Sequence, residues 1–300
     1  MPIFDGVDQL IGRTPMLRLR RVGPAAGAEV CGKLESQNPG GSIKDRPALA
    51  MLQAAEMQGQ LKRGDTIIEA TSGNTGISLA MLAAVRGYRC VLVMPDDASL
   101  TRKQLLKSYG AEVVLTDAAL GMAGAVEQAG KLLAQASRAF MPRQFQNPEN
   151  ARCHELTTAE EIWEDTDGKL DALVIGVGTG GTLTGIARAL KRRRAGLKVI
   201  AVEPRGSAVL SGGEPGLHGI QGLGAGFIPA VLDRALIDHV LTVTDVAADR
   251  MARRLSQEEG LLVGTSAGAN VYAAVEVARQ LPPDQRVVTV LCDTGERYLA

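Results

Sequence analysis

The chain has 300 residues, 45% of them apolar, so it can form one large domain or two ordinary ones, each with its own core. Its 33 lysines and arginines balance 33 aspartates and glutamates. A neutral chain lacks the electrostatic footprint of a protein that binds nucleic acid or an anionic membrane. We interpret the basic run at residues 191–194 as the solvated end of a surface helix.

The sequence also carries no recognisable targeting or metal-binding signal. Its first ten residues contain two aspartates and no basic segment followed by an apolar one, so we expect no secretory leader. No apolar run approaches about 20 residues, so we expect no membrane span. The four cysteines are too widely separated for a zinc site or a disulfide framework. We therefore expect no metal and a reducing, cytoplasmic location.

In chain order, short β-rich runs alternate with longer helical patterns. The expected strands are nearly continuous apolar runs, as in parallel strands covered on both faces: residues 66–70, 90–94, 112–115, 172–175, 198–202 and 286–291. The expected helices are residues 48–59, 75–85, 101–109, 122–136, 183–193 and 270–280. This alternation predicts an α/β fold with two doubly wound domains and mostly parallel sheets.

Two βα series are visible, one from about Glu29 to Leu115 and a second from about Ala172 onward. The polar stretch QFQNPENAR at residues 144–152 lies between them and is a plausible crossing point. Ligands of α/β domains usually lie at the carboxyl ends of the strands and in the cleft between domains. The loops that follow the expected strands are therefore the candidates for ligand binding.

The first distinctive loop is NPGGSIKDR at residues 38–46. Ser42 and Asp45 have the spacing of a capping box, which predicts a helix start with Lys44 in its first turn. The positive end of a helix dipole disfavours a cation, so we expect a neutral Lys44 that can form a Schiff base or act as a base. The alternative is an exposed lysine on a surface helix. The segment is no P-loop, because G-x-x-x-x-G-K-[ST] is absent.

The second loop, TSGNTG at residues 71–76, lies between an expected strand and an expected helix. Backbone amides at such a junction form a concavity that binds anions, and the Thr, Ser and Asn side chains add donors. We expect a carboxylate or a phosphate here. The alternative is an ordinary Gly/Asn turn with a threonine cap.

The third loop, GVGTGGT at residues 176–182, follows the expected strand 172–175. Its glycines let a ligand approach the backbone, and the next helix offers its amides to a phosphate. The loop also resembles a dinucleotide fingerprint, with Glu203 near the place of a ribose-binding carboxylate. The spacing G-x-G-x-G-G lacks the standard third glycine, so it favours a phosphate over NAD specifically. A tight turn without a ligand is the other alternative.

The fourth loop, GTSAG at residues 264–268, matches the G-x-S-x-G nucleophile elbow and follows an apolar run at residues 261–263. In α/β-hydrolases the histidine follows the serine, but His154, His218 and His239 all precede Ser266. A serine hydrolase is therefore disfavoured. We expect Ser266 to be a buried hydroxyl that contacts a ligand, which is compatible with a helix N-cap role.

One ligand would use all four loops. A phosphate suits GVGTGGT, a second anion suits TSGNTG, an aldehyde suits Lys44, and a neutral ring nitrogen suits Ser266. Pyridoxal phosphate with an amino-acid substrate has all these groups: the phosphate, the aldehyde, the α-carboxylate and the ring nitrogen.

The chain resembles the cysteine synthases (O-acetylserine sulfhydrylases), of the pyridoxal-phosphate fold type II shared with the tryptophan synthase β-subunit. The matching stretches span essentially the whole chain: IGRTP (11–15), NPGGSIKDR, EATSGNTGISLA (69–80), MPDDAS (94–99), QFQNPEN (144–150), GVGTGGTLTG, HGIQGLGAGFIP (218–229), GTSAG and CDTGERYL (292–299). The resemblance implies a smaller mobile N-terminal domain of residues 1–11 and 38–148. It implies a larger cofactor-binding domain of residues 12–37 and 149–300, with the cofactor in the cleft between the two.

The resemblance also implies roles for individual residues. Lys44 would carry pyridoxal phosphate as a Schiff base and act as the catalytic base, and Asn74 would bond the ring oxygen. The phosphate would be bound by Gly178, Thr179, Gly180, Gly181 and Thr182. Ser266 would face the ring nitrogen and leave it unprotonated, which favours β-replacement over transamination. The substrate would be bound by Thr71, Ser72, Gly73, Thr75, Met122, Gln144 and Gly222.

The implied reaction forms L-cysteine from O-acetyl-L-serine and sulfide through an aminoacrylate intermediate. GSIKDRPALAM and CDTGERYL are closer to the B isozyme and HGIQGLGAGFIP to the A isozyme. O-phosphoserine, thiosulfate, a sulfur-carrier thiocarboxylate or another thiol, as in cystathionine β-synthase, thus remain alternative substrates. The family implies a homodimer, and A-type relatives bind serine acetyltransferase. An NAD-dependent oxidoreductase and a non-catalytic, partner-binding relative are the other hypotheses.

Overall fold

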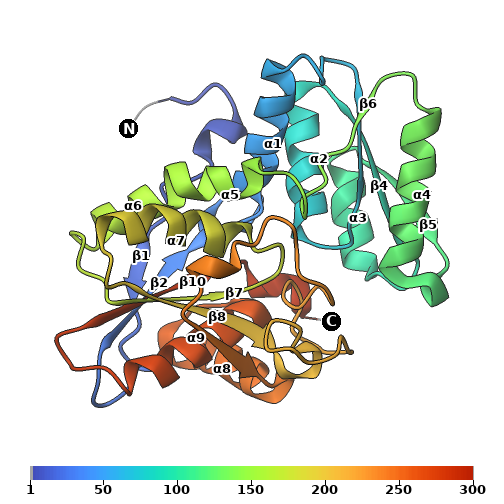
Figure 1. Ribbon diagram of the computed structural model, residues 1–300. Coiled ribbons are helices and arrows are strands. Elements are labelled where there is room, and N and C mark those ends of the chain that lie inside the picture. The colour runs from blue at the N-terminus through green and yellow to red at the C-terminus, as the bar shows by residue number, and fades with distance from the viewer. Residues whose placement is uncertain (1–2, 300) are drawn as a thin grey trace. The chain divides into compact units, whose positions relative to one another are not determined.

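The structure, a computed structural model, describes residues 3–299 (Figure 1). It divides into two compact units. Unit 1 comprises the chain up to Ile11 together with Lys44–Glu149, and unit 2 comprises Gly12–Ile43 and the chain from Asn150 onward. Residues 1, 2 and 300 of the expected domain ranges lie outside the described residues. The mobility and the cofactor-binding role expected of the two domains remain predictions.

Unit 1 is built around a four-stranded sheet in the order β5-β4-β3-β6, whose strand pairs are all parallel. The strands are β3 (Thr66–Ala70), β4 (Arg89–Pro95), β5 (Glu112–Thr116) and β6 (Ala139–Phe140). The helices are α1 (Asp45–Met57), α2 (Asn74–Arg86), α3 (Leu100–Ser108) and α4 (Gly121–Gln135), preceded by the 3-10 turn η1 (Val7–Leu10).

Successive residues of a strand point to opposite faces, which explains why the central strands of unit 1 are mostly apolar, with Glu69 of β3 as a buried exception. On β3, Ile67 packs into a cluster with α1 and α2, whereas Ile68 packs into a second cluster with α4. On β4, Leu92 and Val93 divide in the same way. Both faces of this sheet are therefore covered, and its carboxyl ends open into the loops that carry the motifs.

Unit 2 is built around a six-stranded sheet in the order β1-β2-β10-β7-β8-β9, in which only the described β1–β2 pair is antiparallel. The strands are β1 (Met16–Arg18), β2 (Glu29–Leu34), β7 (Ala172–Gly176), β8 (Lys198–Pro204), β9 (His239–Val243) and β10 (Arg286–Leu291). The helices are α5 (Glu149–Cys153), α6 (Ala159–Asp165), α7 (Gly181–Arg193), α8 (Asp245–Glu259) and α9 (Thr265–Ala278), and a π-helical turn at His154–Thr158 joins α5 to α6.

Helices cover both faces of this sheet as well. The apolar cluster on one face joins the strands to α6 and α7, and the cluster on the other joins them to α8 and α9. Figure 1 shows α6 and α7 on one side of the strands and α8 and α9 on the other. The predicted architecture of two doubly wound, mostly parallel sheets is confirmed.

All six expected strands and all six expected helices are present, with ends that differ by a few residues. The expected series from Glu29 to Leu115 is wrong as a single unit, because β2 pairs with β10 and belongs to the other sheet. The sequence pattern also did not indicate β1, β6, β9, α8 or the α5–α6 segment. The apolar run at residues 261–263 forms no strand but only an isolated bridge from Val263 to Thr294.

Candidate active site

Lys44 stands at the start of α1, but not in the way the sequence suggested. The helix begins at Asp45, so Lys44 is the N-cap residue rather than a member of the first turn. The predicted capping box is wrong, because it needs Ser42 as the N-cap residue, whereas the N-cap residue is Lys44, whose side chain makes no capping bond. The backbone of Ser42 forms an isolated β-bridge with Asp293, and the Asp45 carboxylate accepts a hydrogen bond from Ser78. Lys44 is half-buried, so the alternative of a fully exposed surface lysine does not hold.

A buried hydroxyl ties the start of α1 to the start of α2. The Ser78 hydroxyl lies 2.6 Å from Oδ1 of Asp45 and 3.1 Å from the carbonyl oxygen of Asn74. Asp45 and Ser78 are both fully buried, so these contacts are shielded from water. The contacts bring Lys44, next to Asp45, into the neighbourhood of Asn74 within unit 1.

The TSGNTG loop connects β3 to α2, as the sequence predicted, and α2 begins at Asn74 with Gly73 as its N-cap. The Gly73 amide donates to the Thr71 hydroxyl at 3.2 Å, and the Thr75 hydroxyl donates to Oε1 of Gln144 at 2.7 Å. Thr71, Thr75 and Gln144 are buried. We call residues 71–75 together with Gln144 the carboxylate cradle, because helix-terminal amides and neutral donors suit an anion.

Met122, like Gln144, is distant in the chain from the TSGNTG loop and contacts it in the fold. Its Sδ lies 3.9 Å from the Ser72 hydroxyl, and it stands in the first turn of α4 with a partly exposed side chain. Arg102 donates to the Ser72 carbonyl oxygen at 3.1 Å. The structure thus assembles all the expected substrate residues of unit 1 around one loop.

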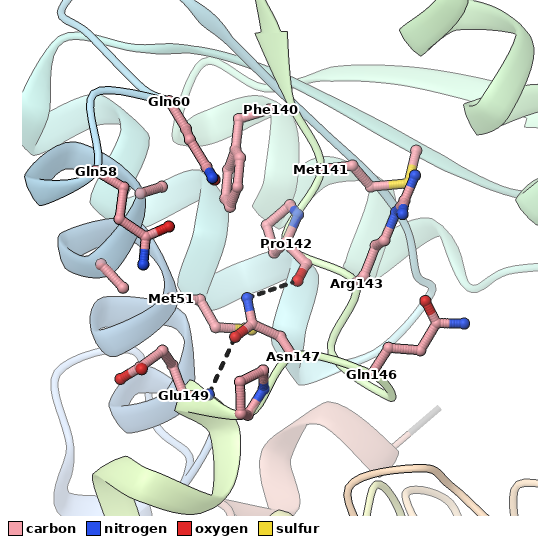
Figure 2. A pocket seen from close by; sticks show the side chains of 13 residues that line it. Met51, Gln58, Gln60, Phe140, Met141, Pro142, Arg143, Gln146, Asn147 and Glu149 are labelled. Carbon is pink, nitrogen blue, oxygen red and sulfur yellow. Dashed lines mark hydrogen bonds between the residues drawn. The ribbon is translucent and has the colours of Figure 1, made fainter.

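A cavity of about 330 Å³ lies beside the segment that carries Gln144 (Figure 2). Asn147 spans this segment, since its Nδ2 donates to the Pro142 carbonyl oxygen and its Oδ1 accepts from the Glu149 amide, both at 3.0 Å. The lining residues come from the end of α1 and from this segment: Met51, Ala54, Ala55, Gln58, Gln60, Phe140, Met141, Pro142, Arg143, Gln146, Asn147, Pro148 and Glu149. Gln144 itself does not line the cavity.

In unit 2 the GVGTGGT loop connects β7 to α7, again as predicted. Gly180 is the N-cap residue with φ +82°, a left-handed conformation that favours glycine. Asn150 donates to the Thr179 hydroxyl at 3.0 Å, and the Thr182 hydroxyl lies 3.2 Å from Nε2 of His154. The first-turn amides of α7 have no partners within the helix, which makes this terminus suitable for a phosphate.

A second loop packs against the glycine loop. A Cβ atom added to Gly178 would lie 2.1 Å from the carbonyl oxygen of Gly222, so the two backbones touch. The Gly224 amide donates to the Val177 carbonyl oxygen at 3.0 Å, and His218 donates from Nε2 to the Gly224 carbonyl oxygen at 3.1 Å. The exposed Gly222 therefore lies next to the expected phosphate loop.

Ser266 is buried in the first turn of α9, one turn before Asn270 and on the same face of the helix. Asn270 accepts from the Gly176 amide at 2.7 Å and donates to the Val290 carbonyl oxygen at 2.8 Å. These bonds fix the start of α9 against the ends of β7 and β10. Ser266 is thereby held near the strand end from which the glycine loop departs.

The structure removes the basis of the nicotinamide alternative. Glu203 is buried, and its carboxylate accepts from the amides of Leu210 and Ser211 at 2.7 and 2.9 Å and from the Ser211 hydroxyl at 2.6 Å. It holds its own loop and is not presented to a ribose. The hydrolase alternative also lacks its strand, because Gly264 follows no strand.

The residues present fit pyridoxal phosphate. The glycine loop offers two threonine hydroxyls and the positive end of α7, and no carboxylate side chain stands in residues 176–182. The contact at Gly178 leaves no room for a side chain, because the loop that carries Gly222 packs directly against it. Ser266 offers a neutral hydroxyl to a ring nitrogen, and Lys44 offers the amine for the aldehyde.

Other sequence features take structural roles. Each residue of the basic run pairs with a carboxylate, namely Lys191 with Asp238, Arg192 with Glu155, Arg193 with Glu160 and Arg194 with Asp171, which confirms the surface-helix interpretation. All four cysteines are free thiols, and burial raises the pKa of Cys31 and of Cys90 to about 12. Within residues 3–299 no His, Cys, Asp or Glu cluster suits a metal ion, and no helix has the length and apolarity to cross a membrane.

A doubly wound α/β fold, a glycine loop at a helix start and a half-buried lysine are typical of one class of protein, the enzymes that hold a phosphate-bearing cofactor. The family model described as "Pyridoxal-phosphate dependent enzyme" matches residues 7–293. The chain belongs to this family, whose cofactor is pyridoxal phosphate. The prediction of fold type and cofactor is confirmed.

Within this family, the chain is similar over nearly its whole length to enzymes that make cysteine or a related amino acid. The chain is 50% identical to a cysteine synthase of Staphylococcus aureus (strain Mu50 / ATCC 700699), over 99% of this chain and 96% of the relative. A solved O-ureido-L-serine synthase is 47% identical with a TM-score of 0.97, covering 100% of this chain and 94% of the other. A solved cysteine synthase of Entamoeba histolytica is 41% identical with a TM-score of 0.96, covering 100% and 90%.

Sequence reasoning missed several residues that shape these loops. Glu69 and Asn150 lie inside motifs that were recognised, but neither was singled out. Asp45 was assigned to a capping box, although it binds Ser78. Asn270 could have been found, because it is a polar residue within the largely apolar pattern of α9 and is fully buried.

Proposed function

We propose that this protein forms L-cysteine by β-replacement, with O-acetyl-L-serine as the amino-acid substrate and sulfide as the nucleophile. The observation that carries the proposal is the bond between Thr75 and Gln144, which completes a buried carboxylate cradle in the same unit as Lys44. The 50% identity to a cysteine synthase over nearly the whole chain supports the same reaction.

In this proposal the predicted residues keep the roles that the resemblance implies. Lys44 would hold the cofactor in its resting form, and Asn74 would bond the ring oxygen. Residues 178–182 would bind the phosphate, Ser266 would meet the ring nitrogen, and Gly222 would contact the substrate. The carboxylate cradle binds and orients the substrate carboxylate, with Met122 beside Ser72. When bound, the cofactor supplies an electron sink for charge that develops at the substrate Cα.

The residues of this chain then manage the proton. The Lys44 amine would act as the general base that accepts the Cα proton of the bound substrate. Acetate departs from Cβ, and sulfide adds to Cβ in its place. Lys44 would return the proton to Cα of the product. The Ser266 hydroxyl carries no negative charge that would stabilise a protonated ring nitrogen, so charge is not stored in the ring and β-replacement is favoured.

Purified protein provides the test. Protein incubated with pyridoxal phosphate and desalted should be yellow, and Lys44→Ala should lose this absorbance band while retaining the fold by circular dichroism. Wild type should produce cysteine from O-acetylserine and sulfide, and Lys44→Ala should not. Protein that cannot be loaded with the cofactor would support the non-catalytic, partner-binding hypothesis instead.

A second candidate is β-replacement with different reactants. The 47% identity to an O-ureido-L-serine synthase supports a nucleophile other than sulfide. The same loaded protein should be assayed with O-acetylserine or O-phosphoserine, each with sulfide, with thiosulfate and with a thiol such as homocysteine. Faster turnover with O-phosphoserine, or with another nucleophile, would replace our substrate assignment without changing the cofactor chemistry.

We also propose a homodimer in the cytoplasm and keep serine acetyltransferase as a candidate partner. The resemblance to cysteine synthases supports the dimer, and HGIQGLGAGFIP supports the partner, since A-type relatives carry it. Four free cysteines fit a reducing compartment. The mass measured by light scattering should be twice the chain mass of 31.5 kDa. This mass should increase further when serine acetyltransferase is added and binds.

A further inference from the structure

We propose that Glu69 is a positioning residue of the carboxylate cradle: its buried carboxylate holds the backbone of Arg143 and Gln144 and thereby sets the place of Gln144. The inference deepens the proposed function and rests on it, because it assigns to Glu69 a share of the affinity for the amino-acid substrate. Glu69 acts through Gln144 and not on the substrate itself.

The contacts of Glu69 are directed at two segments that are far apart in the chain. Glu69 is the penultimate residue of β3, immediately before the TSGNTG loop, and it is buried. Its Oε2 accepts from the Arg143 amide at 2.8 Å, and its Oε1 accepts from the Ala70 amide at 3.2 Å. The Gln144 amide also donates to it. One carboxylate thus joins the end of β3 to residues 143 and 144.

The charge state of Glu69 decides the pH at which this role is tested. Burial raises the pKa of Glu69 to about 7, while the amides of Arg143, Ala70 and Gln144 and the charge of Arg143 oppose the rise. Only an ionised carboxylate presents acceptors alone to several amide donors. Glutamine in its place would turn an NH2 group toward at least one of these amides, so the substitution opposes the clamp while nearly preserving volume.

The segment that Glu69 contacts, residues 143–147, contains a strained backbone conformation that requires stabilising contacts. Arg143 has φ +54°, a left-handed conformation that costs energy for any residue other than glycine. Its carbonyl oxygen accepts from the amides of Gln146 and Asn147 at 2.9 and 3.0 Å, which makes a tight turn. On the cavity side, Asn147 spans the same turn (Figure 2). Glu69 supplies the clamp at the backbone of the residue with positive φ.

Gln144 is consequently fixed twice. Glu69 holds its backbone, and the Thr75 hydroxyl holds its side chain at 2.7 Å. Glu69 precedes residues 71–74 in the chain and Thr75 follows them, and both contact Gln144. Gln144 is therefore held from both ends of the loop that is proposed to bind the substrate carboxylate. Loss of Glu69 should release Gln144 without removing any group that touches the substrate.

The test compares Glu69→Gln with Gln144→Ala and with the double variant, all loaded with pyridoxal phosphate and assayed at pH 8. Glu69→Gln should raise the KM for O-acetylserine about tenfold, as expected for the loss of one buried hydrogen-bonded contact, with kcat and the KM for sulfide changed by less than about threefold. Adding Glu69→Gln to Gln144→Ala should raise the KM no further, because both changes act through the same residue.

Glu35→Gln is the matched control. Glu35 is equally buried and accepts from the Thr14 hydroxyl at 2.7 Å and from Asn38 at 2.8 Å, but it lies in unit 2. This variant should lose stability without a rise in the KM for O-acetylserine. If Glu69→Gln does not fold, Glu69→Asp, which withdraws the carboxylate by one methylene, should show an intermediate rise in KM.

Hydrogen exchange of the cofactor-free protein tests the clamp without reference to catalysis. A peptide covering residues 141–149 should exchange faster in Glu69→Gln than in wild type, and Glu35→Gln should leave this peptide unchanged. Additive KM effects in the double variant, or an unchanged peptide, would overturn the positioning role. Failure of the proposed function would look different: wild type itself would not turn over O-acetylserine, whatever the exchange of the peptide.

Discussion

The Thr75 hydroxyl donates a 2.7 Å hydrogen bond to Oε1 of Gln144, although 69 residues separate the two in the chain. Both side chains are buried, so the bond is protected from competition with water. Because the bond fixes the amide oxygen, it also fixes the orientation of the amide group. The carboxylate cradle is therefore already assembled within unit 1.

Thr75→Val should weaken the binding of O-acetylserine, since valine keeps the shape of threonine but leaves Oε1 of Gln144 without this donor. We expect the KM to rise about tenfold and kcat to change less. Steady-state kinetics of the loaded protein measure both. Thr166→Val is the control, because it removes a 2.7 Å hydroxyl bond to the Ile162 carbonyl oxygen in unit 2 and should leave KM unchanged. Equal effects of the two variants would argue against a role of Thr75 in the cradle.

Gly178→Ala should impair cofactor binding. The added Cβ would lie 2.1 Å from the Gly222 carbonyl oxygen, so one of the two loops must move. Overpacking of this kind costs about 1–3 kcal/mol, and we expect the affinity for pyridoxal phosphate to fall at least about tenfold. Titration of the visible absorbance measures this affinity. Gly196→Ala is the control, because its Cβ would meet nothing within 4 Å, and it should bind the cofactor like wild type.

Lys33→Met should strongly destabilise unit 2. Lys33 is 1% exposed, and its Nζ lies 2.5 Å from the Thr14 carbonyl oxygen, 2.8 Å from Asp165 and 3.0 Å from Glu161. Removing the cation takes away a buried charge that Asp165 and Glu161 both contact, which costs about 2 kcal/mol, less than for a fully buried pair because Asp165 is partly exposed.

Urea unfolding measures this loss, with Lys131→Met as the control. Lys131 forms an exposed pair with Glu127 at 2.7 Å, and its loss should change stability by less than about 0.5 kcal/mol. A similar midpoint for both variants would contradict the assigned importance of the buried lysine.

Glu69 should make the stability of the protein depend on pH. The pKa of Glu69 rises from 4.5 to about 7 on folding, chiefly because the group is buried, so the folded state holds this proton more tightly. The contribution of Glu69 to the free energy of unfolding is fully present below pH 4.5. It decreases by up to about 3 kcal/mol as the pH rises towards about 7. Glu69→Gln cannot ionise, so its stability deficit relative to wild type should be smaller at pH 8 than at pH 5. Urea unfolding of the cofactor-free wild type and variant at both pH values measures this difference in the free energy of unfolding. The same difference at pH 5 and pH 8 would contradict the prediction.

The sequence predicted those parts of the fold that depend on local patterns. The strands Thr66–Ala70 and Arg286–Leu291 have the predicted ends, because they are continuous apolar runs bounded by polar residues. The motif loops at residues 71–76 and 176–182 were placed correctly for the same reason, since each follows such a strand. Resemblance to a family then supplied the candidate roles of residues such as Lys44 and Ser266.

Features that depend on distant partners could not be predicted in this way. Ser42 and Asp45 match a capping box locally, but in the folded chain the helix begins at Asp45, and the Asp45 carboxylate accepts a hydrogen bond from Ser78, 33 residues further along. The sheet to which β2 belongs is decided by β10, which lies at the other end of the sequence. Glu69 was not recognised because its partners, Arg143 and Gln144, become neighbours only after folding.

The pairing of β2 with β10 has a consequence for synthesis on the ribosome. Residue 29 aligns with residue 286, and β10 lies between β2 and β7 in the sheet, so the sheet of unit 2 cannot close until β10 has been synthesised. The strands and main helices of unit 1 lie within Lys44–Glu149, so their contacts are more local and can form earlier. We expect nascent chains that end before β10 to hold a folded four-stranded unit and an unpaired β2 edge that requires protection from aggregation.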